Sequence, residues 1–230
     1  QVINAIANGN TDILILEDAT SQLTGFQTVR DAILSSPYQS SILFFPILFA
    51  LILSTEYKFG QESLTKLLTP KWQTVLTGQI CSGIIVSSTL TVVLSLINSG
   101  MLYMMLDETL QSYLNLGLIL EVTLRIIIFS ITLTLLSMFL VKITRKPIPS
   151  VIIIVSILVI TLSGILRIVS PTLENLFPLT GAKSFAFGRV ENNNPSEMYG
   201  LLLLLSQASI VTILMYIKAW YKNQKDKKHG

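Results

Sequence analysis

Residues 42–53 read Ile-Leu-Phe-Phe-Pro-Ile-Leu-Phe-Ala-Leu-Ile-Leu, the centre of an uncharged segment from Tyr38 to Ser54. A helix needs roughly 20 apolar residues to cross the hydrocarbon of a bilayer, and this segment is close to that length. Pro46 should kink such a helix, which membrane helices tolerate when their neighbours satisfy the freed carbonyl group. Four more segments of this kind follow along the chain: 73–98, 117–141, 148–168 and 198–217. The sequence therefore predicts an all-α integral membrane protein with about five transmembrane helices.

Composition supports a membrane protein and excludes several other classes. The chain has 230 residues, of which 51% are hydrophobic and only 13% charged, and its mean hydropathy is +0.65. Soluble domains carry about 25% charged residues, because their surface faces water. The net charge is +3, but the basic residues lie in short separate segments instead of forming one basic face, so we expect no nucleic-acid partner.

Polar segments separate the predicted spans and divide the chain. They comprise an extracytoplasmic segment (1–37), an insert (55–72), two turns (99–116 and 142–147), an outer connector (169–197) and a basic tail (218–230). Within the first, Ile13–Leu16 is too short to span a bilayer and is expected to form a short strand or an interfacial turn.

Lys and Arg divide unevenly between alternate segments. The insert 55–72, the turn 142–147 and the tail hold eleven of them. The alternate side holds four, which are Arg30, Lys183, Arg189 and Arg167 at the outer end of the span 148–168, and Arg125 lies within a span. Because Lys and Arg are retained on the cytoplasmic side, we expect the insert, this turn and the C-terminus to face the cytoplasm.

The insert contains a short amphipathic pattern. Leu64, Leu67 and Leu68 fall on one face of a helix, while Glu62 and Lys66 lie four residues apart on the other. The predicted helix covers about residues 60–70. An isolated helix of this length is marginal and needs a surface to pack against. That surface is either lipid headgroups and the protein's own bundle, or a separate partner.

The same segment carries a resemblance to a known family. Glu56, followed by Gly60, then Leu67-Leu68-x-Pro70 and a base, directly after an apolar span, resembles the permease subunits of type 2 ABC exporters, small antimicrobial-peptide or drug exporters of bacteria among them. The sequence departs from the family's pattern in having Gln61, where Thr is frequent, and Lys71, where Arg is frequent. The resemblance covers about residues 38–220.

The resemblance implies the following architecture and partners. The segment 60–70 would be a cytoplasmic coupling helix, with Glu56 at the membrane exit, Gly60 in the turn, Pro70 as the stop and the three leucines as a ridge that docks into a P-loop ATPase. Two copies of that ATPase would hold ATP and Mg, and a second permease copy or a related permease would complete the complex. The family has six spans, so a first span is expected to precede Gln1.

The resemblance also implies the function. The chain would be the transmembrane subunit of an exporter in the bacterial plasma membrane, moving an amphipathic or hydrophobic substrate such as a bacteriocin, a toxin or a drug. The alternatives are an ATP-independent secondary transporter and a membrane scaffold or sensor. A secondary transporter would normally show ionisable residues at mid-span or broken helices in paired repeats.

The chain itself shows no catalytic or cofactor pattern. It has no Gly-x-x-x-x-Gly-Lys-Ser/Thr loop, and its only histidine is His229 in the basic tail, so we expect no enzyme activity, no bound cofactor and no metal. Cys81 is the single cysteine, which excludes a disulfide within the chain.

Glu121 and Arg125 are charged residues inside a predicted span. They lie four residues apart near the outer end of 117–141, and charges in a membrane helix usually face the protein interior. Two interpretations remain open: the pair lines a substrate pathway, or it forms an ion pair within the helix, with Arg125 extending outward to the headgroups.

Overall fold

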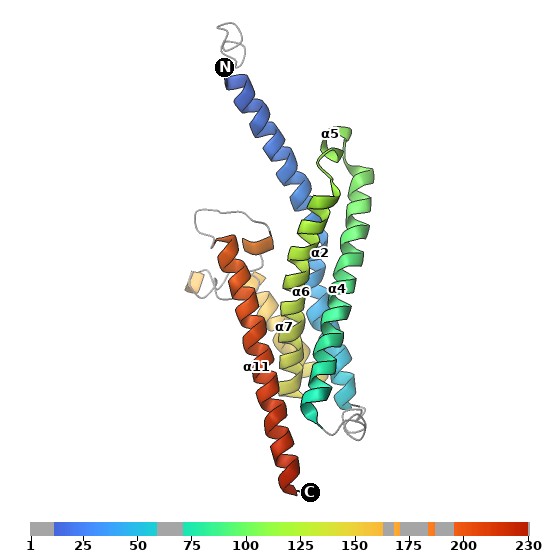
Figure 1. The fold of residues 1–230 in the computed structure, drawn as a ribbon, viewed down its shortest axis with the longest axis vertical. Helices are drawn as coiled ribbons and strands as arrows, with labels where there is room; N and C mark the ends of the chain where they lie inside the picture. Colours follow the sequence, from blue (N-terminus) through green and yellow to red (C-terminus); the bar gives the residue numbers. More distant parts are fainter. Residues whose placement is uncertain (1–11, 59–70, 163–167, 171–183, 187–195, 230) are drawn as a thin grey trace.

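The computed structural model describes residues 12–58, 71–162, 168–170, 184–186 and 196–229, and all regular secondary structure in these ranges is helical. The long helices are α2 (Asp12–Lys58), α4 (Trp72–Met105), α6 (Leu116–Thr144), α7 (Pro147–Leu162) and α11 (Glu197–His229). A short helix, α5 (Glu108–Gln111), lies between α4 and α6. The long helices stand side by side as an elongated bundle (Figure 1).

Four of these helices are long and apolar enough to cross a membrane. The qualifying segments are Thr24–Thr55, Trp72–Met105, Leu116–Thr144 and Glu197–Gln224. The fold class expected from the sequence, an all-α multi-pass membrane protein, is therefore confirmed. The remaining predicted span, 148–168, corresponds to α7, whose 16 residues end next to residues 163–167, which lie outside the described ranges.

The first described helix is longer than the apolar segment it contains. α2 runs for 47 residues and includes both Pro37 and Pro46. The strand or turn expected at Ile13–Leu16 is wrong, because these residues lie in the first turns of α2. A four-residue apolar run cannot distinguish a strand from one turn of a longer helix.

The break that Pro37 makes in the hydrogen bonds of α2 is repaired by a neighbouring helix. Proline has no N–H to donate to the carbonyl of the residue four positions earlier, Ile33. Asn98 of α4 supplies the missing donor: its Nδ2 lies 2.8 Å from the Ile33 carbonyl oxygen and 3.2 Å from that of Ala32. The polar side chain of Asn98 thereby joins α4 to α2 at the position where α2 lacks its own bond.

α6 occupies the centre of the bundle and contacts α2, α4, α7 and α11. Its buried hydroxyl groups link these helices. The Ser130 hydroxyl lies 2.8 Å from that of Ser41 in α2 and accepts a hydrogen bond of 3.0 Å from Thr91 in α4. All three side chains are fully buried. Interhelical hydrogen bonds and close packing hold membrane helices together, because lipid is as apolar as the core itself.

From Gly83 onward, the buried face of α4 is built from small residues. Gly83, Ser87, Thr91, Ser95 and Ser99 recur at every fourth position along it. At Gly83 an added Cβ would lie 3.1 Å from Met138 Sδ of α6, so the two helices approach closely there. Small residues at such spacing let membrane helices pack backbone to backbone. Ser87, Thr91, Thr132 and Thr134 are buried within the bundle, whereas Thr89 is exposed.

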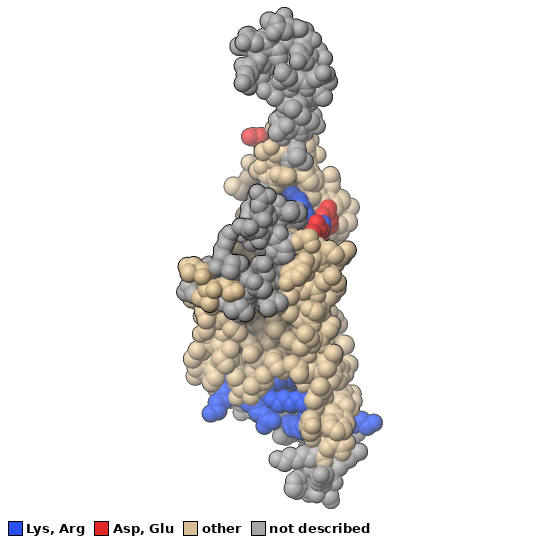
Figure 2. Space-filling view, turned by 90° about the vertical axis from the view of Figure 1, so that its left-hand side faces the viewer, with Lys and Arg blue, Asp and Glu red and all other residues tan. Residues whose placement is uncertain are grey.

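The outer surface is apolar along the bundle and charged at its two ends. Large hydrophobic side chains such as Ile85, Leu96 and Leu124 are more than half exposed. Lys and Arg gather at one end, where α2, α6 and α11 finish and α4 begins, whereas carboxylates lie toward the other (Figure 2). We call the first the basic end. Its described basic residues are Lys71, Lys142, Arg145, Lys146, Lys218 and Lys222.

Candidate functional site

The ion pair predicted within α6 forms in the structure. Arg125 Nη2 and Nε lie 2.9 Å and 3.0 Å from Glu121 Oε1. Both residues lie in the first half of α6, whose N-terminus is capped by the Asn115 side chain accepting a hydrogen bond of 2.8 Å from the Leu118 N–H. The cap fixes where the helix starts, and the four-residue spacing then places the two side chains one above the other.

Arg125 also contacts two segments that lie far from it along the sequence, at Phe185 and at Glu197. Its Nη1 donates a 2.6 Å hydrogen bond to the carbonyl oxygen of Phe185, and the guanidinium carbon lies 5.3 Å from the centre of the Phe185 ring. The same nitrogen pairs with Glu197 Oε1, at the first residue of α11. A carboxylate at this position is favourable in its own right, because the N-terminus of a helix carries partial positive charge.

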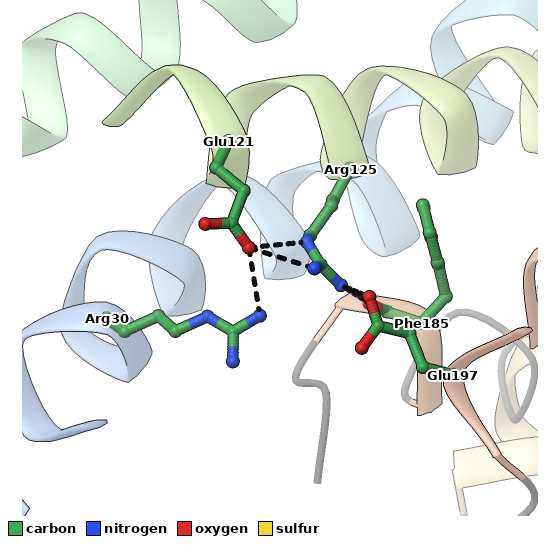
Figure 3. A network of polar contacts seen from close by, with 5 residues as sticks. All are labelled: Arg30, Glu121, Arg125, Phe185 and Glu197. Carbon is green, nitrogen blue, oxygen red and sulfur yellow. Dashed lines mark hydrogen bonds and ion pairs between the residues drawn. The ribbon is translucent and has the colours of Figure 1, made fainter. Parts of the chain in front are cut away.

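Arg30 of α2 completes the cluster. Its Nη2 lies 3.5 Å from Glu121 Oε1, the oxygen that Arg125 also contacts. Figure 3 shows the result: two arginines and two glutamates from three helices, with the backbone of Phe185 as an additional acceptor. We call these five residues the outer network. Its side chains carry two positive and two negative charges, so they balance.

Within the outer network, the arginines are more deeply buried than the glutamates. The side chains of Arg30 and Arg125 are 16% and 15% exposed, whereas those of Glu121 and Glu197 are 47% and 43% exposed. The interpretation in which Arg125 extends outward to the headgroups is wrong. Its guanidinium turns inward to α11 and the helical residues 184–186, because two acceptors, the Glu197 carboxylate and the Phe185 carbonyl, are available there. The pair within the helix, which the same interpretation included, is present.

The arrangement has two chemical capacities. It ties α2, α6 and α11 together at the end of the bundle opposite the basic end, with one arginine between two carboxylates. It also presents those carboxylates at a half-exposed surface: all the contacts of Glu121 and Glu197 described above fall on Oε1, and the second oxygen of each points away from the arginines (Figure 3).

The sequence indicated two of these five residues. Arg30 and Glu197 lie in polar flanks far from α6 along the chain, and no local spacing connects them to Glu121 or Arg125. The only signal was that Arg30 and Glu197 are charged residues at the ends of apolar segments on the same predicted side. Phe185 enters through its backbone, for which a sequence offers no signal.

The residues predicted to dock an ATPase fall almost wholly outside the described ranges. Glu56 lies in the last turn of α2, and its side chain is not described. Gly60, Leu64, Leu67, Leu68 and Pro70 belong to residues 59–70, outside the described ranges. The flanking helices are described: α2 ends at Lys58 and α4 begins at Trp72, both at the basic end (Figure 1).

No protein-family model matches the chain, and neither the curated proteins nor the solved structures that were compared with it gave a match.

Proposed function

We propose that this chain is the membrane-spanning permease subunit of an ATP-driven exporter of the type 2 ABC class. The observation that supports this most is the segment between α2 and α4, from Glu56 to Lys71. It combines the exit glutamate, the glycine, the leucine ridge and the proline stop of the family's coupling helix. Both helices that flank it end at the basic end, where a partner at the membrane surface would meet it.

The basic end faces the cytoplasm in this proposal. The support is the charge distribution: Lys and Arg are retained on the cytoplasmic side, and they gather at this end of the bundle. With this orientation the segment 59–70 and the C-terminus are cytoplasmic and the outer network is external. A P-loop ATPase then reaches the coupling helix, and its closure on ATP moves the spans through that contact as a hinge motion.

The substrate proposed is an amphipathic or hydrophobic molecule, such as a peptide of the bacteriocin or toxin kind or a drug. Apolar walls suit the hydrophobic part of such a molecule. The half-exposed carboxylates of Glu121 and Glu197 suit a cationic group as it leaves toward the outer side. Arg125 holds these two carboxylates in place, so the pair predicted to line the pathway acts together with Glu197.

The docking ridge is the part of the proposal to test first. Replacing Leu64, Leu67 and Leu68 together by Asp should abolish co-purification of a P-loop ATPase of about 25–35 kDa, the size of a one- to two-domain subunit. The reason is that an apolar ridge which fits a cleft cannot enter it with three charges. The measurement is affinity purification of the tagged permease, with identification of the ATPase by its phosphate-binding loop in mass spectrometry.

A matched control adds the same charge to the other face of the predicted helix. The double substitution Lys66→Asp/Thr69→Asp changes the net charge by as much as the triple substitution, but it leaves the leucines in place. It should retain the ATPase, and both variants should be found in the membrane in normal amounts. Retention of the ATPase by the triple variant, or its loss from both variants alike, would contradict docking through the ridge.

The rival proposals predict a different complex. A secondary transporter or a membrane scaffold purifies without a stoichiometric P-loop ATPase, and its function does not depend on ATP hydrolysis. Purification of the wild-type chain from its native membrane distinguishes these classes before any substitution is made.

A further inference from the structure

A pocket opens at the basic end, where α4, α6 and α11 meet. Four of its lining residues are basic: Lys142 of α6, Arg145 at the end of α6, and Lys218 and Lys222 of α11. Among the residues that the structure describes, no carboxylate lines it. We propose that this pocket binds the phosphate group of an anionic phospholipid in the cytoplasmic leaflet. The proposal is independent of the exporter assignment, because it rests on residues that do not belong to the coupling segment.

Neutral acceptors orient two of the ammonium groups. Lys142 Nζ donates to Gln79 Oε1 at 2.6 Å, and Lys218 Nζ donates to the carbonyl oxygen of Lys142 at 2.6 Å. That carbonyl is one of the last in α6, which have no partner within the helix. Both acceptors are uncharged, and these two bonds position the ammonium groups at the pocket.

Arg145 is placed in the pocket at an energetic cost. Its φ is 54°, and no other non-glycine residue among those described has a positive φ. Its N–H donates a hydrogen bond of 2.8 Å to the Val141 carbonyl oxygen, which ends α6. A non-glycine residue in this conformation costs on the order of 1 kcal/mol or more, and glycine is the usual residue there. An arginine at this position carries a guanidinium to the pocket wall, and guanidinium is well suited to phosphate.

The position of the pocket at the expected level of the lipid headgroups favours a lipid over a free anion. Trp220 and Tyr221, which are 48% and 65% exposed, flank the pocket residues of α11, and exposed Trp and Tyr lie at the headgroup level of membranes. The Lys222 ammonium nitrogen lies over the ring of Trp72, at the start of α4, 3.3 Å from the ring centre. A phosphate held here therefore has its acyl chains beside exposed apolar residues such as Ile143 and Ile217, which are about half exposed.

Binding in the pocket would also join two parts of the molecule. The N–H of Trp72 donates a hydrogen bond of 2.9 Å to Asn223 Oδ1. The start of α4, which follows segment 59–70, therefore already contacts α11. A phosphate shared by α6 and α11 would strengthen this contact at the basic end.

The test compares phosphatidylglycerol with phosphatidylcholine of the same acyl chains, titrated onto the purified full-length chain in detergent and counted by native mass spectrometry. Phosphatidylglycerol should bind the wild-type chain at least about tenfold more tightly. Arg145→Gly should weaken it about fivefold, the effect of one basic residue near an anionic lipid. Glycine relieves the backbone strain, so this variant should keep or exceed the wild-type melting temperature.

The matched control is Lys146→Gln, which removes one positive charge at the adjacent exposed residue that does not line the pocket. It should leave the affinity for phosphatidylglycerol unchanged. Equal binding of the two lipids, or equal weakening in both variants, would overturn the proposal. Inorganic phosphate at millimolar concentration should not displace the lipid; displacement would assign the pocket to a free anion instead.

Discussion

At the scale of single residues, Asn98 supplies the hydrogen-bond donor that Pro37 removes from α2. The carbonyl of Ile33 would be left without a donor inside the bundle, and an unpaired carbonyl in an apolar environment is costly. The amide of Asn98 supplies that donor at 2.8 Å. The pair Pro37–Asn98 should therefore behave as an energetic unit.

A double-mutant cycle tests this coupling. Asn98→Leu should lower the free energy of unfolding by about 1–2 kcal/mol, because it removes an interhelical hydrogen bond and leaves the Ile33 carbonyl unpaired. In the Pro37→Ala background the same substitution should cost less, because alanine restores the backbone N–H that serves this carbonyl. Thermal or denaturant unfolding of the four proteins in detergent gives the coupling energy. Equal costs in both backgrounds would contradict it.

Arg125 is the residue on which the outer network depends. It lies between Glu121 and Glu197, so Arg125→Gln leaves two carboxylates near each other without the cation that separates them. The attachment of α11 to α6 should weaken by about 1–2 kcal/mol, less than for a fully buried pair because both glutamates are partly exposed.

Hydrogen exchange measures this loosening at the place where it should occur. Amides in the first turns of α11, around residues 198–201, should exchange about tenfold faster in Arg125→Gln, as a loss of about 1.4 kcal/mol implies. Lys146→Gln, at the basic end, should leave them unchanged. Unaltered exchange in Arg125→Gln would show that α11 is held by other contacts.

At the scale of elements, close packing of α4 on α6 depends on Gly83. A Cβ at this position would lie 3.1 Å from Met138 Sδ and 3.4 Å from Thr134 Cγ2. The methionine sulfur belongs to a flexible side chain, so Gly83→Ala should change the stability by less than about 0.5 kcal/mol. Gly83→Leu should destabilise by about 1–3 kcal/mol or more, because the helices must separate to admit it.

Gly78, on the same helix, provides the matched control. An added Cβ there meets nothing within 4 Å, so Gly78→Leu should leave the melting temperature nearly unchanged. If leucine at the two positions has equal effects, the close approach of α4 and α6 near Gly83 does not occur.

The sequence predicts the elements well where lipid dictates them. Apolar runs in 73–98 and 117–141 fall inside α4 and α6, because a helix that crosses hydrocarbon must be apolar along that length. Boundaries were predicted less well. α2 begins at Asp12 and α11 runs to His229, since helices continue into polar residues that a hydropathy criterion does not recognise.

The candidate site was predicted only in its local part. The spacing of Glu121 and Arg125 is a property of one helix and can be seen in the sequence. The positions of Arg30 and Glu197 depend on how three helices pack, and the contact with Phe185 involves its backbone carbonyl. Such contacts follow from tertiary structure and leave no periodic pattern.

At the scale of the whole molecule, the bundle has an apolar exterior between two charged ends with different functions in our account. The outer network ties three helices together with balanced charge, and the basic end bears the phosphate pocket and the two helix ends that flank the coupling segment. The central claim is that the segment between those helix ends is bound by a separate ATPase.

Photo-crosslinking in intact membranes tests this claim most directly. A benzophenone amino acid at position 67, in place of Leu67, should crosslink this chain to a P-loop ATPase, whereas the same probe in place of Lys66 on the opposite face should crosslink far less. Crosslinks from position 67 that reach only lipid or the chain's own helices would contradict the account.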